Sequence, residues 1–250
     1  MKPKTQEQIA AMREGGAILA KIMAELAKIV KPGLKPTEIS ARASDLIKKN
    51  QVRPALLGFQ GYQDVMCVSV NEAVVHGIPG KEPFKAGDVV KLDLAIAHKD
   101  MIVDTAVTVA VGKPSAEVKR LLEGTRRALS AGIEAISGDG TRVGDISSAI
   151  EDILKKNHLG IVRDLVGHGV GYSVHENPNI PNYGSAGTGP KLSAGMTIAI
   201  EPMATLGGWE VGVLKDGWTV VTRDGSLAAH FEHTVLITED SAEILTLADK

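Results

Sequence analysis

The chain has 250 residues and a formal net charge of −2, with acids and bases spread along its length. That length suits one large domain or two packed halves. The small net charge and its even distribution along the chain argue against sequence-specific nucleic-acid binding or a membrane-surface role. Cys67 is the sole cysteine, which excludes an intrachain disulfide and favours a reducing compartment. With no signal-peptide pattern and no membrane span, the sequence predicts a cytoplasmic protein forming a single domain over residues 1–250.

Hydrophobic periodicity predicts two helices at the start of the chain and two more after its midpoint. Apolar residues recur at helical spacing from residue 9 to 29, ahead of Pro32-Gly33, and again over 37–50. The scheme returns over 118–136 and 143–153. Each helical pair is followed by short runs typical of strands, at 66–70, 89–96, 102–111, 196–202, 218–222 and 230–237. The segment 177–194 is dense in Pro, Gly and Asn and is predicted as a loop.

The two halves of the chain repeat each other. Residues 31–50 and 138–157 align without a gap at seven identical positions of twenty, and both end in Lys-Lys-Asn. FKAGDVVKLD, ending at Asp93, matches LSAGMTIAIE, ending at Glu201, and DTAVTV from Asp104 parallels EHTVLI from Glu232. The period is too long for a solenoid. It predicts related halves over about 5–112 and 115–240, forming an α+β fold with approximate twofold symmetry and a central cleft.

Four acids at matching places in the repeat suggest a metal site. Asp93, Asp104, Glu201 and Glu232, joined by His168 between two glycines, offer oxygen-rich ligation suited to two-metal hydrolysis. For any single acid, a solvated strand face is the better interpretation. Asp93, for example, alternates onto the same face as Lys91. The repeat makes coincidence a poor account of all four.

Further histidines fall near predicted loops. His76, in NEAVVHGIPG, and His175, just before Glu176, are candidates for positioning a substrate or moving a proton. His230 and His233 flank Glu232, so one of them is expected to touch the site.

These motifs carry a family resemblance that covers essentially the whole chain. SVNEAVVHGIPG, the Asp93 and Asp104 pair, GHGVGYSVHENPNIPNYG, AIEPM and WTVVTRDGSLAAHFEHT resemble the type I methionine aminopeptidases of the compact bacterial form. The resemblance implies the pita-bread fold, with antiparallel sheet covered by two helix pairs and a dinuclear metal site in the central cleft. It also implies removal of the initiator methionine from nascent chains.

The resemblance further implies which residues act. One metal would be held by Asp104, His168, Glu201 and Glu232, and the other by Asp93, Asp104 and Glu232, with a water between them as nucleophile. Glu201 would accept a proton, His175 would steady the scissile amide, and His76 would contact the substrate. The ions could be Mn, Fe(II), Co or Zn. The family expectation is a monomer that meets nascent chains at the ribosome.

A methionine pocket is implied in the same way, by Tyr62, Cys67 and Trp218. Two positions depart from the family pattern, because Leu56 stands where bacterial relatives often have Cys, and Val174 where they often have Phe. Gln60 replaces a frequent His near the second-residue subsite. Strict methionine preference is therefore a weaker expectation than hydrolysis.

Two other functions fit the same residues. An Xaa-Pro aminopeptidase or prolidase would share all five ligands but usually carries an extra N-terminal domain. A non-catalytic binding protein on this fold would have lost its ligands. A type II methionine aminopeptidase would need an insert between His168 and Glu201, which are only 33 residues apart.

Overall fold

A computed structural model describes residues 2–247 of the chain. Four helices are present in this range: α1 (Gln6–Ile29), α2 (Pro36–Lys49), α3 (Ala116–Glu134) and α4 (Val143–Lys156). All four coincide with the predicted helices to within three residues at each end. Thr5 caps α1, where its hydroxyl accepts from the backbone N–H of Gln8, and Ser115 caps α3 in the same way through Val118.

The strands form one large antiparallel sheet and two small ones. The large sheet has the order β1 (Arg53–Pro54), β4 (Val89–His98), β5 (Met101–Ala110), β14 (Glu232–Ile237), β9 (Thr197–Ile200), β7 (Gly167–Gly169) and β8 (Glu176–Ile180), with β2 (Cys67–Val70) paired to β4 and β15 (Ala242–Ile244) to β14. The first small sheet joins β13 (Ala228–His230), β10 (Met203–Thr205) and β6 (Gly160–Ile161). The second joins β11 (Val211–Val213), β12 (Val220–Thr222) and β3 (Ala73–Val75).

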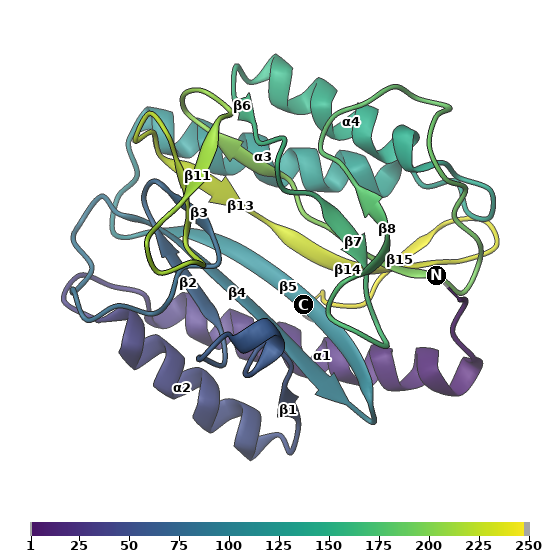
Figure 1. Ribbon diagram of the computed structural model, residues 1–250, viewed down its shortest axis with the longest axis horizontal. Coiled ribbons are helices and arrows are strands. Elements are labelled where there is room, and N and C mark those ends of the chain that lie inside the picture. Colours follow the sequence, from purple (N-terminus) through teal and green to yellow (C-terminus); the bar gives the residue numbers. More distant parts are fainter. Residues whose placement is uncertain (1, 248–250) are drawn as a thin grey trace.

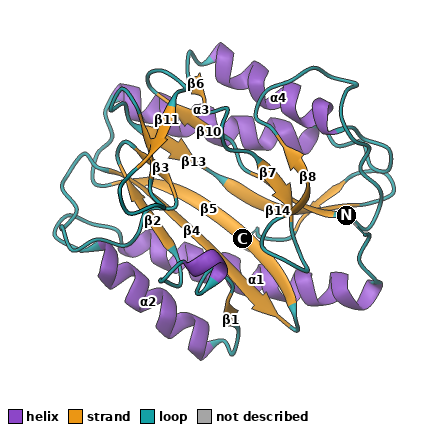
Figure 2. Cartoon of the chain, viewed as in Figure 1, coloured by secondary structure: helices purple, strands orange, loops and turns teal. Residues whose placement is uncertain are grey.

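Each helix pair covers its own part of the large sheet. In Figure 1 the α1–α2 pair lies below and the α3–α4 pair above, with β4, β5 and β14 running between them, and Figure 2 shows the same arrangement by element type. Leu92, Leu94 and Ile96 of β4 pack in one core with α1 and α2, while Ile198 and Ile200 of β9 pack in a second core with α3 and α4. The odd-numbered residues of β4 therefore face away from the helices.

The internal repeat is visible in matched contacts of the two helix pairs. Glu38 and Asp145 each accept a hydrogen bond from the backbone N–H of the residue before their helix, at 2.9 Å in both cases. The shared Asn closes each helix, because the amide of Asn50 donates to Leu46 O and that of Asn157 donates to Ile153 O. Matched positions of the repeat thus make the same hydrogen bonds at the helix ends.

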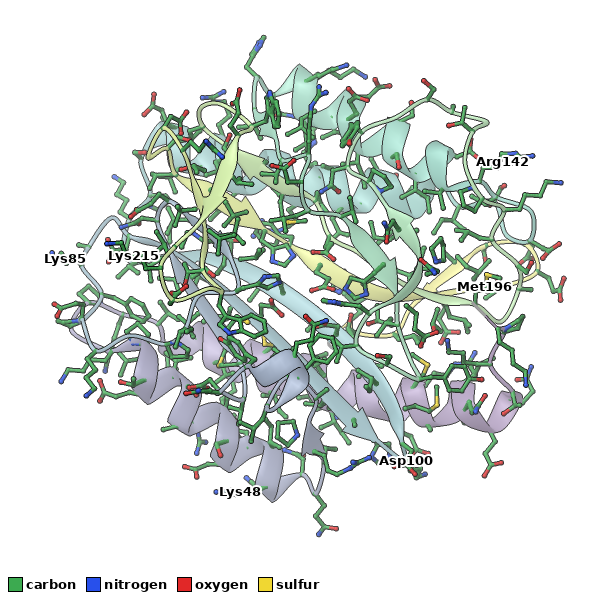
Figure 3. The ribbon with its side chains drawn as sticks, viewed as in Figure 1. Lys48, Lys85, Asp100, Arg142, Met196 and Lys215 are labelled. Carbon is green, nitrogen blue, oxygen red and sulfur yellow. The ribbon has the colours of Figure 1, made fainter. Side chains whose placement is uncertain are left out.

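The structure also corrects three details. The segment 177–194 is not wholly loop, because β8 extends to Ile180. The strand expected over 230–237 is interrupted at Phe231, which separates β13 from β14. Lys91, which by alternation alone could lie with Asp93 on a solvated strand face, is only 1% exposed. The β4–β5 turn forms at Lys99 and Asp100, both with positive φ, as a two-residue hairpin. Figure 3 shows Asp100 at the tip of that hairpin.

Candidate active site

Strand register brings the four acids and His168 onto one face of the large sheet. Asp93 and Glu232 are each paired with Ala106, so they lie in one row across β4, β5 and β14. Asp104 is two residues from Ala106 and shares its face. On β9 and β7, Ala199 is paired with His168, and Glu201 lies two residues beyond it on the same face. Residues from both halves of the repeat therefore meet.

These side chains line a cavity of about 600 Å³. Asp93, Asp104, His168, Glu201 and Glu232 all contribute to its wall, as do His76 and His175. Three of them, Asp104, His168 and Glu232, place possible ligand atoms within 4.8 Å of one another. The structure thus assembles the seven polar residues that the sequence singled out, from segments up to 156 residues apart.

His168 presents one ring nitrogen to the cluster. Its Nδ1 lies 2.9 Å from Gly169 O, and because a carbonyl can only accept, this nitrogen carries the proton. The lone pair is then on Nε2, which lies 3.3 Å from Glu201 Oε1. A backbone carbonyl that fixes the tautomer in this way is typical of a metal-binding histidine.

Burial strongly disfavours the charged forms of the acids. Desolvation raises the pKa of Asp104 to about 7. It raises the pKa of Asp93, Glu201 and Glu232 well above their usual ranges, and the charge of Asp104 adds to each of these shifts. Among the described residues, Asp104 Oδ1 and Glu232 Oε1 are buried without a hydrogen-bond partner. Buried carboxylates with unused oxygens are costly unless a cation binds them, so the donor set fits a divalent metal.

His76 and His175 stand at the cavity wall apart from the acids. His76 is half-buried with φ +57°, and burial lowers its pKa to about 4. His175 is exposed toward the opening, and desolvation by its neighbours lowers its pKa. Its ring centroid lies 4.3 Å from that of His168 and 5.3 Å from that of Phe59. Both rings are therefore neutral near pH 7 and able to donate or accept a proton.

An apolar end of the cavity is built around Tyr62, Cys67 and Trp218. The rings of Tyr62 and Trp218 meet edge to face with centroids 5.0 Å apart, and the Tyr62 hydroxyl donates to Met66 O or Gly77 O, each 3.1 Å away. Leu56 and Gln60 also line the cavity. Val174 is buried and is not among the described residues that line it.

Among the lining residues that the sequence did not clearly indicate, Phe59 and His230 contact the candidate polar residues. Phe59 lies between two glycines of positive φ, in a short turn, and packs its ring against His175. His230 is the histidine beside Glu232 that touches the site, since its Nε2 lies 3.3 Å from Glu201 Oε2. His233 points away and lies 2.9 Å from Thr246 Oγ1. The signal available for Phe59 was an aromatic residue framed by Gly58 and Gly61.

Comparison of the chain with known proteins identifies its family. Residues 10–239 match the model of metallopeptidase family M24. The chain belongs to metallopeptidase family M24. It is 43% identical over 244 residues to the methionine aminopeptidase of Clostridium perfringens, covering 98% of both chains. It is 43% identical to methionine aminopeptidase 1 of Bacillus subtilis over 243 residues, covering 97% of this chain and 98% of that one.

Solved structures of M24 proteins show the same fold. The crystal structure of methionine aminopeptidase from Thermotoga maritima superposes with a TM-score of 0.96 at 45% identity, covering 99% of both chains. The prolidase from Pyrococcus furiosus gives a TM-score of 0.78 at 25% identity, and the match covers 99% of this chain but only 66% of that one. The M24 chain described here therefore has the pita-bread fold. Across residues 2–247, none of its helices has the length and apolar character needed to traverse a bilayer.

Proposed function

We propose that this chain is a methionine aminopeptidase that removes the N-terminal methionine of peptides and nascent proteins by hydrolysis of the first peptide bond. The observation that carries the proposal is the meeting of Asp93, Asp104, His168, Glu201 and Glu232 on one cavity wall beside an apolar pocket. Full-length similarity to methionine aminopeptidases supports it.

The five ligands suit two divalent ions. Asp104, His168, Glu201 and Glu232 would hold one ion and Asp93, Asp104 and Glu232 the other, so that Asp104 and Glu232 bridge. Mn, Fe(II), Co and Zn all accept such a carboxylate and imidazole set. Divalent ions bound there would supply a water acidified toward neutral pH and a Lewis acid for the scissile carbonyl. The bridging roles are consistent with the unpartnered oxygens of Asp104 and Glu232.

The chain's own residues would orient the substrate and move protons. Glu201, whose pKa is raised by burial, is suited to accept a proton and pass it to the leaving amine. His175, at the opening, would donate to the scissile carbonyl, while His76 would contact the substrate near its leaving nitrogen. Both rings face the cavity from opposite halves of the repeat, which lets them hold the amide between them.

The apolar pocket would select the methionine side chain. Tyr62, Cys67 and Trp218 supply an aromatic and sulfur-bearing wall suited to a thioether. Leu56 adds apolar volume on one side and Gln60 lies at the exposed edge, toward the second residue of the substrate. Val174, behind the wall, would influence the pocket's volume indirectly.

We further propose that the chain acts as a monomer in the cytoplasm, as a single catalytic domain over 1–250, with transient ribosome contact. Sedimentation of the purified protein would test the first point. Retention on ribosomes during centrifugation through sucrose, at low and at physiological salt, would test the last.

Peptide cleavage tests the main proposal. Metal-stripped protein, resupplied with Mn, Co or Fe(II), would be given Met-Ala-Ser beside an Xaa-Pro peptide, with His168→Ala as control. Metal-dependent release of methionine alone, lost in the control, is the expected result. Cleavage of only the Xaa-Pro peptide would move the assignment to the proline peptidases, and inactivity with every metal would favour a non-catalytic binding role.

A further inference from the structure

His230 is buried without a conventional hydrogen bond to its ring. Its side chain is only 2% exposed, and neither ring nitrogen has a partner among the described residues that meets hydrogen-bond geometry. Two carboxylates of the site lie near Nε2, with Glu201 Oε2 at 3.3 Å and Glu232 Oε2 at 4.0 Å. Burying an imidazole without a hydrogen bond costs free energy, and a role of the ring at the site would explain why this cost is tolerated.

The main chain of His230 is held on both sides. The Thr108 hydroxyl donates to His230 O at 2.6 Å and accepts from His230 N at 2.9 Å. On the other side, His230 is paired with Met203 in the β10–β13 ladder. These contacts hold the His230 backbone between two neighbouring strands, and the side chain it carries is buried beside Glu201.

Glu201 lies between two imidazoles, but only one of them can donate to it. Its Oε1 is 3.3 Å from His168 Nε2 and its Oε2 is 3.3 Å from His230 Nε2. His168 carries its proton on Nδ1, bound to Gly169 O, so a neutral His168 has no proton on Nε2. The donor available to Glu201 is therefore His230.

We propose that His230 is a positioning residue: its Nε2, which lies 3.3 Å from Glu201 Oε2 without hydrogen-bond alignment here, would donate to that oxygen once the proposed ions are bound, leaving the other carboxylate oxygen directed toward His168 and the ions. The inference rests on the proposed function and deepens it. With Oε2 held, Glu201 presents a single oxygen to the site. Without His230, the carboxylate is free to rotate, so both metal binding and proton transfer change.

Two substitutions of similar length separate hydrogen bonding from packing. His230→Gln keeps a nitrogen donor, whereas His230→Met fills comparable space with no donor. His233→Gln is the matched control, because His233 lies on the same β13–β14 segment but its ring faces Thr246, away from the cavity. Three quantities are measured for each protein: Co(II) affinity by calorimetry after metal stripping, the visible spectrum of the Co(II)-loaded protein, and kcat and KM for Met-Ala-Ser.

We expect His230→Met to weaken Co(II) binding or lower kcat by about 10- to 100-fold, as loss of an outer partner of a metal ligand typically does. Its Co(II) spectrum should shift and its KM should change little, while His230→Gln recovers most of both properties. Equal behaviour of the Gln and Met variants, or Met-variant values within twofold of the unaltered protein, would overturn the proposal. If the unaltered protein released no methionine, the proposed function would fail, yet Co(II) affinity and spectrum would still decide the role of His230.

Discussion

Replacing Asp104 by Asn should stabilise the metal-free protein at alkaline pH. Asp104 is buried, with 5% of its surface exposed, and desolvation raises its pKa from 3.8 to about 7. The folded state therefore retains a proton that the unfolded chain loses near pH 4. The contribution of this retained proton to the free energy of unfolding is complete below pH 4 and is lost as pH rises through about 7.

The size of the effect follows from the shift. A difference of about three pKa units at about 1.4 kcal/mol each corresponds to about 4 kcal/mol of folding free energy for one buried carboxyl. The Asp104→Asn substitution would remove this loss of stability at high pH, because the Asn side chain does not titrate. It would also remove the charge that raises the pKa of Asp93, Glu201 and Glu232. The metal-free variant should therefore exceed the unaltered protein in stability at pH 8 by up to about 4 kcal/mol, with a flatter pH dependence.

Urea denaturation in EDTA at pH 5, 6, 7 and 8 measures this difference. Asp152→Asn, an exposed change on α4, is the control for charge alone and should leave the pH dependence unchanged. Adding Mn should stabilise the unaltered protein but not Asp104→Asn, because the variant lacks the carboxylate proposed to bridge the two ions. The reasoning is refuted if metal-free Asp104→Asn is no more stable than the unaltered protein at pH 8, or if both lose stability equally between pH 5 and 8.

Three further changes test separate parts of the structure. Gly16→Ala should destabilise the protein by roughly 1–3 kcal/mol in thermal unfolding, because the added Cβ would lie 2.0 Å from Leu245 O. Lys4→Met should lower kcat/KM for Met-Ala-Ser several-fold, since the Lys4 ammonium lies 3.4 Å from Glu176 Oε2, next to His175; an unchanged value would contradict this. Trp218→Ala should raise KM roughly tenfold with a smaller change in kcat, as expected for lost ground-state binding in the pocket.

The helices and the long strands could be predicted because each has a local signal. Helical spacing of apolar residues and the Pro32-Gly33 stop located α1, and the alternation and Gly punctuation located β4 and β5. The short strands carry no such signal. β6 and β7 have two and three residues, and they are strands because β10 pairs with β6 and because β8 and β9 pair with β7. Tertiary pairing, which a single sequence does not reveal, defines them.

The candidate site was predictable to the extent that the repeat and family motifs marked it. The motifs supplied the five candidate ligands, together with His76 and His175, all of which line the cavity. They did not supply Phe59, whose contact with His175 depends on a turn with positive φ at Gly58, Gln60 and Gly61. Nor could they choose between His230 and His233. In the structure the two rings have different surroundings, because His230 Nε2 lies 3.3 Å from Glu201 Oε2 while His233 Nδ1 lies 2.9 Å from Thr246 Oγ1.

Lys91 and Asp93 show why alternation alone misleads at this site. The pattern correctly placed both on one face of β4, opposite the leucines that pack on α1. A charged face usually means solvent, but here the face is inside the molecule. Lys91 is paired with Ser69 on β2 and Thr108 on β5, and its ammonium donates to Asn71 O at 2.7 Å and Val89 O at 3.2 Å.

The inner face of this sheet is polar because it lines a cleft between two halves, and a cleft that binds cations needs charge on the inside. Alternation reports that a strand has two unlike faces, without saying which one is exposed. The repeat supplied the missing information. Asp93 and Glu201 follow the same Ala-Gly pair at the same spacing in the two halves, which indicates that both acids face inward. In a pita-bread sheet, the internal repeat therefore identifies the face that bears the candidate site better than the polarity of single residues does.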